Sequence, residues 1–467
     1  MSGTRTTAGA NEADEVARAT PAGDGPGTDA ASPDAPTGIL RSGLLAGLDP
    51  DELAGRFGTP LYVYDLDVID GQVDRLRAIL PDPVELAYAL KANPSLALVA
   101  HLGRRGLGAD IASAGELATA LRAGIGPGSI VFTGPGKREA ELALAVERGI
   151  RAVTVESAAE LERLERIAAA AGRRVPVLLR AAVSDPARHE AVRLIGDEGA
   201  GKFGMDRSDL RLAARRAARS DHLELLGLHA FGASNVREAG VLAEHVAVTV
   251  ALAVEVTREA GVPLRLVDAG GGLGISYQAD EAPLDLAELG ARLAAQAARW
   301  RLEPATRRMR LLLEPGRFLV GPAGAYLARV VDRKTVDGRA VAILDGGIHH
   351  LLRPALVGQE QRIHVFGSPP IRGGTLPSGA AAGPVTIAGP LCSGLDVLSR
   401  GVVAAHPAVG DLVAVLDAGA YGFTEAMPFF LSHPVPAEVV VRAGRAELVR
   451  PRLEPEAWLG WQRDPGL

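Results

Sequence analysis

Short apolar runs alternate with longer stretches of helical periodicity between residues 84 and 315. Stretches such as 157–171 and 241–260 repeat their apolar residues at the spacing of an amphipathic helix. Strict alternation of strand and helix predicts a parallel sheet, and eight such units can close into an α/β fold, a (β/α)8 TIM-type barrel, whose chemistry lies at the carboxyl ends of its strands. The eight predicted strands are Glu85–Leu90, Gly108–Ile111, Ser129–Phe132, Ala152–Val155, Pro176–Leu179, Leu225–Ala230, Leu264–Ala269 and Arg310–Pro315.

The 467-residue chain exceeds the roughly 250 residues that such a barrel needs. Residues 1–37 contain almost no large apolar side chain, which predicts a disordered tail. We expect residues 38–60 to form a lead-in segment that pairs with a second domain, residues 61–316 to form the barrel, and residues 456–467 to form a tail. Short β-like runs separated by Gly and Pro predict a C-terminal all-β domain over residues 317–455. Those runs are Ala325–Val331, Ala340–Leu344, Leu412–Val415 and Glu438–Val441, and Gly367–Gly383 is predicted to be a surface loop.

Composition narrows the classes of partner. The formal charge of -6 is spread along the chain without a basic block, so we expect neither a nucleic-acid nor a membrane partner. No uninterrupted apolar run reaches the roughly 18 residues of a membrane span. Cys392 is the only cysteine and can form no intramolecular disulfide, which favours a reducing, cytoplasmic location. An enzyme acting on a small molecule is the expected class.

Chemically distinctive residues follow several of the predicted strands. Lys91 follows the first strand, where it could be an ordinary solvated charge or an amine that attacks a carbonyl once its pKa is lowered. His229 ends the sixth strand, a position at which a histidine is more often structural than catalytic. Glu314 and Arg317 follow the eighth strand and could form a surface ion pair at a Pro-Gly turn. The triple glycine Gly270–Gly272 follows the seventh strand, and its backbone N–H groups could surround an anion.

Both glycine segments of the barrel lack a nucleotide motif. Ile275 stands where a dinucleotide fingerprint that begins at Gly270 needs its last glycine, and Val131 and Arg138 break the P-loop pattern around Lys137. Taken together, the lysine, the glycine loop, the histidine and the glutamate match what pyridoxal 5'-phosphate requires: a covalent partner, a phosphate site, a ring-stacking group and an acid facing the pyridine nitrogen. We therefore predict a pyridoxal-phosphate site at the barrel mouth and no metal site.

The chain resembles the fold-type III pyridoxal-phosphate decarboxylases, the family of diaminopimelate, ornithine and arginine decarboxylases. The resemblance covers about residues 50–445, and the family fold of a barrel joined to a β domain agrees with the expectation above. The motifs that carry it are Tyr88–Asn93, Gly108–Glu116, Gly201–Gly204, Asp268–Gly272, Glu314–Arg317, Cys392, Asp417–Gly422 and Pro434–Val439.

The resemblance implies roles for individual residues. Lys91 would bind the cofactor covalently, His229 would stack on its ring, and Glu314 would keep the pyridine nitrogen protonated, which favours decarboxylation over racemisation. Cys392 would protonate the carbon that loses carbon dioxide, or order the substrate, in the pocket of a partner subunit; a homodimer with shared active sites is thus implied. The other residues implied at the cofactor are Asp110, Ser234, Gly271, Gly272, Arg317 and Tyr421.

Departures from the diaminopimelate enzymes bear on the substrate. Those enzymes follow the cysteine with a glutamate that receives the substrate's distal ammonium, and Ser393 stands at that position here. Val357 replaces the tyrosine of the Arg-Pro-x-Leu-Tyr motif, so the distal pocket is expected to be more apolar. An ammonium group without a carboxylate partner would be costly to bury, which argues against free diaminopimelate. The expected substrate contacts are Arg317, Arg353, Cys392, Ser393, Asp396 and Tyr421.

These departures resemble the butirosin-type, acyl-carrier-linked amino acid decarboxylase branch of the family. The resemblance implies decarboxylation of an L-amino acid or amino-acid conjugate, small or tethered to a carrier protein, in specialised biosynthesis. One alternative is a diaminopimelate decarboxylase of lysine biosynthesis with an unusual pocket. The other is a non-catalytic homologue that binds or regulates, although the chain keeps Lys91, Cys392 and the β domain that such relatives tend to lose.

Overall fold

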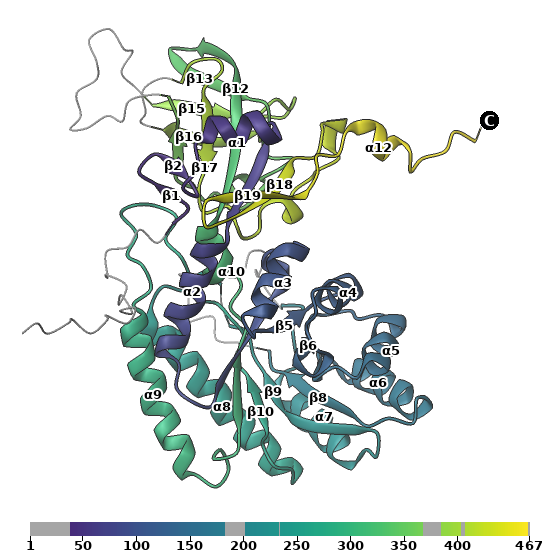
Figure 1. Ribbon diagram of the computed structural model, residues 1–467. Helices are drawn as coiled ribbons and strands as arrows, with labels where there is room; N and C mark the ends of the chain where they lie inside the picture. Colours follow the sequence, from purple (N-terminus) through teal and green to yellow (C-terminus); the bar gives the residue numbers. More distant parts are fainter. Residues whose placement is uncertain (1–37, 183–200, 233, 368–383, 403–406, 466–467) are drawn as a thin grey trace, which may run out of the picture. The chain divides into compact units, whose positions relative to one another are not determined.

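The computed structural model describes residues 38–182, 201–232, 234–367, 384–402 and 407–465 (Figure 1). The predicted tail over residues 1–37 lies outside the described residues, and so does the predicted surface loop Gly367–Gly383 except for Gly367. The described residues all belong to one compact unit, Thr37–Leu467.

Eight parallel strands close into a barrel, which confirms the predicted fold. Neighbouring strands pair in chain order, and β11 pairs with β4 to complete the ring. The strands are β4 (Val84–Ala89), β5 (Gly108–Ile111), β6 (Ile130–Phe132), β7 (Ala152–Val155), β8 (Val175–Arg180), β9 (Leu223–His229), β10 (Leu266–Asp268) and β11 (Arg310–Leu313). Each predicted strand is therefore present, and its ends differ from the prediction by at most two residues.

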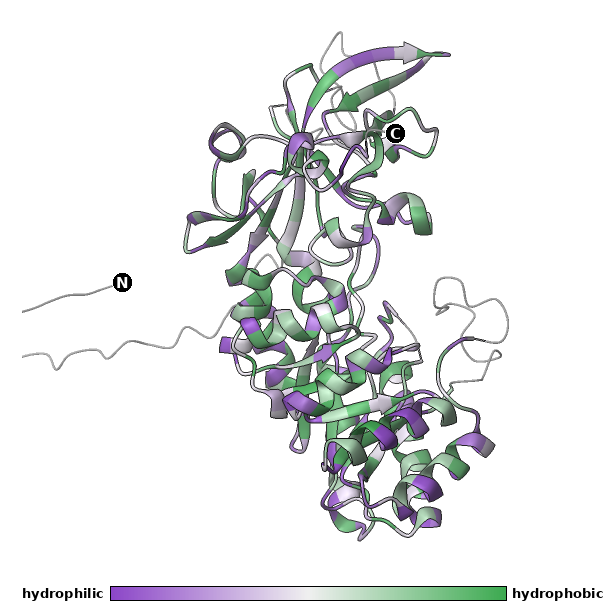
Figure 2. Cartoon of the chain, turned by 90° about the vertical axis from the view of Figure 1, so that its right-hand side faces the viewer, coloured by the Kyte–Doolittle hydropathy of each residue, from purple (hydrophilic) through white to green (hydrophobic). Residues whose placement is uncertain are grey.

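Helices cover the outside of the barrel, and the strands are apolar on both faces because neither face meets water. In Figure 2 hydrophobic and hydrophilic residues alternate along the helices that surround the barrel. Several helices begin at a capping side chain: Ser113, Ser157 and Asp206 each accept a hydrogen bond from the first helical turn. The helices are α2 (Leu66–Ile79), α3 (Leu96–Arg104), α4 (Ala114–Arg122), α5 (Glu139–Arg148), α6 (Ala158–Ala170), α7 (Arg207–Arg219), α8 (Ala239–Ala260) and α9 (Leu286–Leu302).

Helix α8 is long and apolar enough to span a membrane by those two criteria alone. The sequence expectation counted uninterrupted apolar runs and so did not identify it. Its buried residues, including Leu242, Val246 and Val250, belong to the main hydrophobic core of the barrel. Packing in that core accounts for the apolar character of the helix.

The C-terminal part of the chain supplies eight of the nine strands of a second sheet, as the β-like runs predict. The sheet is built around the long strand β12 (Gly324–Val336), which pairs with strands on both sides. Its other late strands are β13 (Arg339–Leu344), β14 (Ile363–Val365), β15 (Val385–Ala388), β16 (Val397–Val402), β17 (Leu412–Val415), β18 (Ala437–Arg442) and β19 (Arg445–Arg450). Short helices α10 (Arg317–Val320) and α11 (Arg353–Val357) lie between them in the sequence.

The boundary between the two domains differs from the sequence expectation. Strand β3 (Leu61–Asp65) lies in the second sheet, between β12 and β18, although residue 61 was expected to begin the barrel. All five of its residues are buried, so its pattern is that of a barrel strand. The preceding segment, with β1 (Leu40–Arg41), β2 (Leu44–Leu45) and α1 (Pro50–Phe57), contributes Ile39 and Leu53 to the same core cluster as β3.

The end of the chain also differs from the tail expected from residue 456. It contains the short helix α12 (Pro455–Leu459), and Trp458 stacks on Phe429 with ring centroids 5.0 Å apart.

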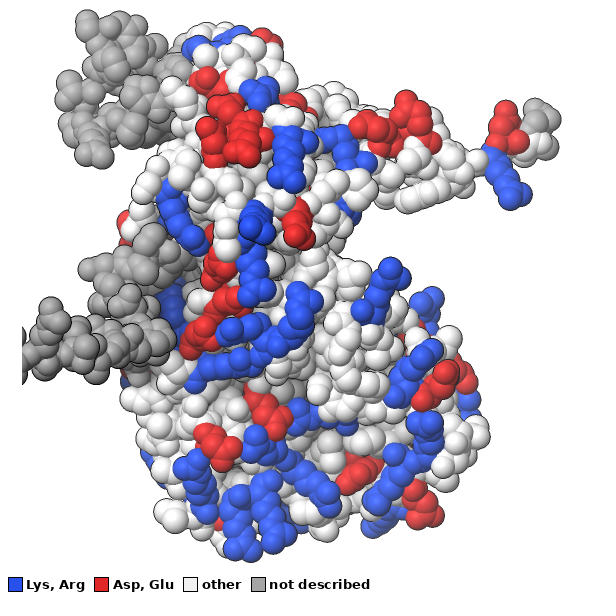
Figure 3. All heavy atoms as spheres, viewed as in Figure 1, with Lys and Arg blue, Asp and Glu red and all other residues white. Residues whose placement is uncertain are grey.

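Charged side chains of both signs occur over the barrel and the β domain on the face shown in Figure 3.

Candidate active site

Lys91 lies at the carboxyl end of β4, in a single 3-10 turn that follows the strand. Its Nζ donates a hydrogen bond to Oδ2 of Asp110, at the end of β5, over 2.8 Å. Burial alone would lower the pKa of Lys91, but the carboxylates of Asp110 and Glu314 outweigh that effect and raise it. Burial and the charge of Glu314 raise the pKa of Asp110 to about 6. At neutral pH Lys91 therefore keeps its proton and forms an ion pair with the Asp110 carboxylate.

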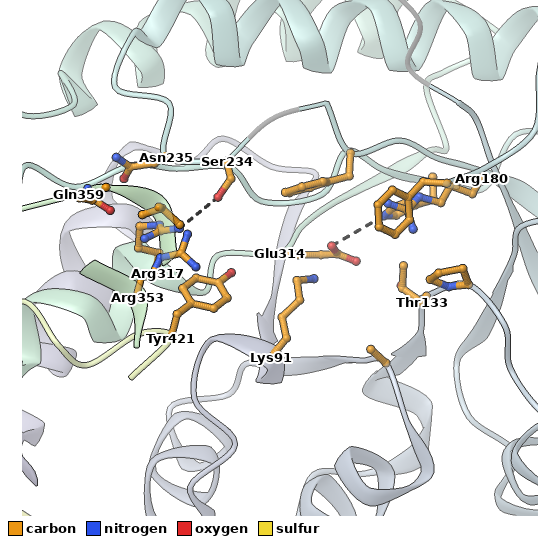
Figure 4. Close-up of a pocket in the computed structure, with 18 residues that line it drawn as sticks. Lys91, Thr133, Arg180, Ser234, Asn235, Glu314, Arg317, Arg353, Gln359 and Tyr421 are labelled. Atoms are coloured by element: carbon orange, nitrogen blue, oxygen red, sulfur yellow. Dashed lines mark hydrogen bonds and ion pairs between the residues drawn. The ribbon is translucent and has the colours of Figure 1, made fainter. Parts of the chain in front are cut away.

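Glu314 follows β11 and points toward Lys91 (Figure 4). Its Oε2 lies 3.7 Å from Nε2 of His229, at the end of β9, and both side chains are almost fully buried. Burial alone would raise the pKa of Glu314, but the His229 ring and the Lys91 ammonium lower it below its usual range. Both ring nitrogens of His229 and Oε1 of Glu314 lack a hydrogen-bond partner among the described residues. Polar atoms that are buried without a partner point to a polar ligand.

A glycine loop borders the same site immediately after β10. Gly270 and Gly272 adopt positive φ angles of 66° and 84°. A Cβ at Gly271 would collide with the carbonyl oxygen of Glu314, so the loop lies against the backbone that follows β11. Only glycine permits both the positive φ angles and the close approach of the two backbones. The backbone N–H groups of such a loop can bind an anion.

Four further polar side chains, those of Ser234, Arg317, Arg353 and Tyr421, lie together at one end of the site. Nη2 of Arg317 donates to Oγ of Ser234 over 3.2 Å, and the Arg317 guanidinium lies over the ring of Tyr421 at 4.7 Å from its centroid. Arg353 lies over the same ring at 4.6 Å and pairs with Glu425 at 2.9 Å. Figure 4 shows these side chains grouped at one end of the site.

Most of these side chains line a cavity of about 660 Å³, whereas the expected phosphate-loop residues Gly271 and Gly272 are not among its described lining residues. Of the side chains expected at the site, the structure brings Lys91, His229, Ser234, Glu314, Arg317, Arg353 and Tyr421 into its lining, with Asp110 bonded to Lys91. Tyr421 and Arg353 come from the chain beyond the barrel, so both domains build the cavity. Its other lining residues are Ala112, Thr133, Gly134, Pro135, Arg180, Phe203, Phe231, Asn235, Val357, Gly358 and Gln359.

Three expected substrate contacts lie outside the cavity of the single chain. Cys392 is exposed, and neither it nor Ser393 is among the described lining residues. The Asp396 carboxylate is buried and accepts hydrogen bonds from the backbone N–H groups of Ile348 at 2.8 Å and Leu391 at 2.7 Å. Asp396 was expected to contact the substrate. Instead, these hydrogen bonds hold its carboxylate against the backbone and anchor the loop that carries Cys392.

Sequence reasoning missed several residues that line the cavity. Arg180 ends β8 and pairs with Glu156 at 2.6 Å, while its guanidinium lies over Phe203. A charged residue that ends an apolar strand is the same signal that singled out Lys91, so Arg180 could have been found. Gln359 lies just after α11 and has no such signal in the sequence.

The residues present fit pyridoxal 5'-phosphate. The site offers an amine, a histidine ring with both nitrogens available, a buried carboxylate and a glycine cradle. All of them lie on one rim, at the carboxyl ends of the strands, where barrel enzymes carry their chemistry.

Comparisons with known proteins agree with this assignment. The family described as pyridoxal-dependent decarboxylase, pyridoxal binding domain, matches residues 66–321. The chain is 33% identical over 402 residues to L-glutamyl-[BtrI acyl-carrier protein] decarboxylase of Niallia circulans, covering 85% of this chain and 92% of that protein. It is 34% identical over 413 residues to a diaminopimelate decarboxylase of Aquifex aeolicus, covering 88% and 93%. The crystal structure of diaminopimelate decarboxylase from M. jannaschii superposes with a TM-score of 0.83 at 28% identity, covering 92% of this chain and 98% of that one.

Proposed function

This chain belongs to the family of pyridoxal-dependent decarboxylases and is a pyridoxal-phosphate-dependent amino-acid decarboxylase, and we propose that its substrate is an L-amino acid or amino-acid conjugate without a free distal ammonium group. Family membership confirms the resemblance that the motifs around Lys91, Gly271 and Glu314 indicate. The choice of substrate depends on the rest of the cavity.

The charges that line the cavity support this substrate class. Glu314 is the only carboxylate among the described lining residues, and it lies at the cofactor end beside His229. A distal ammonium group would lose its hydration there without gaining a carboxylate partner, which is costly. A carboxylate, an amide or a thioester carbonyl could instead accept a hydrogen bond from Arg353, whose Nε has no partner among the described residues, since Lys91 and Arg317 are assigned to the cofactor and Arg180 pairs with Glu156. The basic residues of the lining are Lys91, Arg180, Arg317 and Arg353.

The far end of the cavity supports the same conclusion. Val357, Gly358 and Gln359 form its wall and supply no charge. A glutamyl group or a conjugate of it has no distal ammonium group and so needs no carboxylate partner in this part of the cavity. The relative from Niallia circulans, whose name gives an L-glutamyl acyl-carrier protein as its substrate, is consistent with this choice.

The chain's own residues account for the steps around the cofactor. Bound pyridoxal phosphate supplies an electron sink for the electron pair left on the α-carbon when the carboxylate leaves as carbon dioxide. Lys91 would attach the cofactor through its Nζ once that amine has lost its proton, and the hydrogen bond to Oδ2 of Asp110 at 2.8 Å would position the amine. Glu314 would hold a proton on the pyridine nitrogen, and His229 would pack against the ring.

The polar end of the site would hold the phosphate. Arg317 donates to Ser234 and lies over Tyr421 there, and we expect these three side chains and the N–H groups of Gly271 and Gly272 to contact the phosphate. Several donors aimed at one anion fix the orientation of the cofactor and keep water from its reactive carbon.

We also infer a homodimer in which each chain supplies Cys392 and Ser393 to its partner's cavity. This inference is supported by the exposure of Cys392 and by its absence from the described lining of its own chain's cavity. The thiol would then protonate the α-carbon after carbon dioxide leaves.

A substrate panel tests the proposal. Purified holoenzyme is incubated with free L-glutamate, with L-glutamate and L-aspartate tethered to an acyl carrier protein, and with meso-diaminopimelate, and carbon dioxide release is measured. We expect turnover of an acidic or conjugated amino acid and at most a trace with meso-diaminopimelate. Substantial turnover of meso-diaminopimelate would refute the substrate assignment.

Diaminopimelate decarboxylation is the second candidate, favoured by the 34% identity to the Aquifex aeolicus enzyme. If it were correct, Ser393→Glu would restore a carboxylate for the distal ammonium and improve turnover of meso-diaminopimelate. If the proposed substrate is correct, the same change lowers activity, because it places a negative charge beside an acidic or carbonyl group. Absence of carbon dioxide release with every substrate would instead support a non-catalytic homologue.

A further inference from the structure

A second buried carboxyl lies beneath Glu314. Asp268 ends β10 and is completely buried. One oxygen of Asp268, one of Glu314 and one ring nitrogen of His229 all lie within 4.8 Å of one another. Oδ1 of Asp268 accepts the N–H of Gly270 over 2.9 Å, whereas Oδ2 has no hydrogen-bond partner among the described residues. Oε1 of Glu314 also has no hydrogen-bond partner among the described residues.

The nearby cationic side chains stabilise a negative charge on Glu314 rather than on Asp268. His229 faces Glu314 at 3.7 Å, and Lys91 lies on the cavity side of Glu314, bonded to Asp110. The negative charges of Glu314 and Asp110 disfavour a negative charge on Asp268. The hydrogen bond that Asp268 accepts comes from the neutral backbone N–H of Gly270. Two carboxylates this close, and both buried, cannot both remain ionised, so one proton is retained between them.

We propose that Asp268 is a positioning residue that keeps this proton on Oδ2 and shares it with Glu314, so that Glu314 remains ionised and oriented toward the pyridine nitrogen of the cofactor. Because Oδ1 also accepts the Gly270 N–H, the same side chain ties the first residue of the phosphate loop to the acid that faces the ring. Asp268 contacts neither substrate nor cofactor in this role. It acts through Glu314 and Gly270.

The electrostatic environment agrees with this assignment of the proton. Burial raises the pKa of Asp268 well above its usual range, and the charge of Glu314 raises it further. For Glu314 burial acts in the same direction, but the His229 ring and the Lys91 ammonium reverse it. The proton therefore belongs to the deeper group, and the negative charge faces the cavity.

The proposal makes a chemical prediction about substitutions. A protonated carboxyl is neutral and donates one hydrogen bond, and the amide of Asp268→Asn reproduces both properties at the same size. Asp268→Ala removes the donor and leaves Glu314 without a partner at the base of the site. If Asp268 were ionised instead, Asp268→Asn would delete a charge and disturb the site as strongly as Asp268→Ala.

Two measurements on the full chain test this, and neither needs a substrate. Infrared difference spectra of the protein with ¹³C-labelled aspartate should show, at neutral pH, the C=O stretch of a protonated aspartic acid in the wild type that disappears in Asp268→Asn. The ¹⁵N chemical shift of labelled pyridoxal phosphate in the holoenzyme should report a protonated pyridine nitrogen in the wild type and in Asp268→Asn, and a shift toward the unprotonated value in Asp268→Ala.

Several outcomes would overturn the proposal. They are the absence of the carboxylic-acid band from the wild type, its persistence in Asp268→Asn, or a ¹⁵N shift in Asp268→Asn that matches Asp268→Ala. If Asp268→Ala does not fold, the wild type and Asp268→Asn decide the question by the infrared band alone. Because no turnover is measured, failure here is independent of whether the proposed substrate is correct.

Discussion

Lys137 and Glu160 form a buried ion pair behind the cavity wall, and we predict that it is among the costliest contacts to break. Their side chains are 1% and 2% exposed, and Nζ of Lys137 lies 2.6 Å from Oε1 of Glu160. The other two ammonium protons go to the carbonyl oxygens of Gly134 and Thr154, each at 2.7 Å. Since Gly134 lines the cavity, the lysine holds part of the wall in place.

The expected magnitude follows from this burial. Lys137→Met leaves the Glu160 carboxylate buried and unpaired, which should lower the free energy of unfolding by about 3–5 kcal/mol. Removing both charges in Lys137→Met/Glu160→Leu should recover most of that loss, because no buried charge is then left without a partner. The magnitude of the double-mutant coupling energy should therefore be at least about 3 kcal/mol, at or above the upper end of the range seen for residues in contact.

Urea unfolding of the cofactor-free protein, followed by circular dichroism, measures these differences. Arg216→Met is the matched control, because Arg216 pairs with Glu162 and Glu165 on the surface and its side chain is 44% exposed. It should cost less than about 1 kcal/mol. The reasoning fails if Lys137→Met is as mild as this control, or if the effects of the two buried substitutions simply add.

Three further predictions concern the cofactor and the active site. Asp110→Asn removes the carboxylate that contributes most to raising the pKa of Lys91. The rate of pyridoxal-phosphate attachment, followed by absorbance, should therefore begin to rise at a lower pH than in the wild type. An unchanged pH profile would contradict the ion pair between Lys91 and Asp110. Gly271→Ala should weaken cofactor binding because its Cβ would meet a backbone carbonyl, whereas Gly126→Ala, which has open space, should not; equal affinities in a titration would argue against the cradle. Lys91→Ala and Cys392→Ala should each abolish decarboxylation, and mixing the two inactive proteins should restore part of it if the sites are shared; no recovery after subunit exchange would argue against shared sites.

The barrel could be predicted from the sequence because its strands and helices carry distinct local patterns. The strands are short runs buried on both faces, and helices such as α6 and α8 repeat apolar residues at helical spacing. The same logic misplaced Leu61–Asp65, since a central strand of the second sheet is also buried throughout. Local pattern does not identify the sheet to which a buried strand belongs.

The active site was partly predictable for a related reason. Residues such as Lys91 and Glu314 end strands of one barrel, so topology alone brings them to one rim. Asp268 also ends a strand, but its pairing with Glu314 depends on the distance between side chains, which sequence does not contain. Gln359 enters the cavity from the β domain and follows no strand of the barrel.

Covalent attachment of pyridoxal phosphate to Lys91 is the claim on which the whole assignment depends. The most direct measurement is reduction of the holoenzyme with borohydride, followed by proteolysis and mass spectrometry of the labelled peptide. We predict a single pyridoxyl-modified peptide with the label on Lys91 and none in Lys91→Ala. A label on another lysine, or no label after the cofactor has been supplied in excess, would contradict the account.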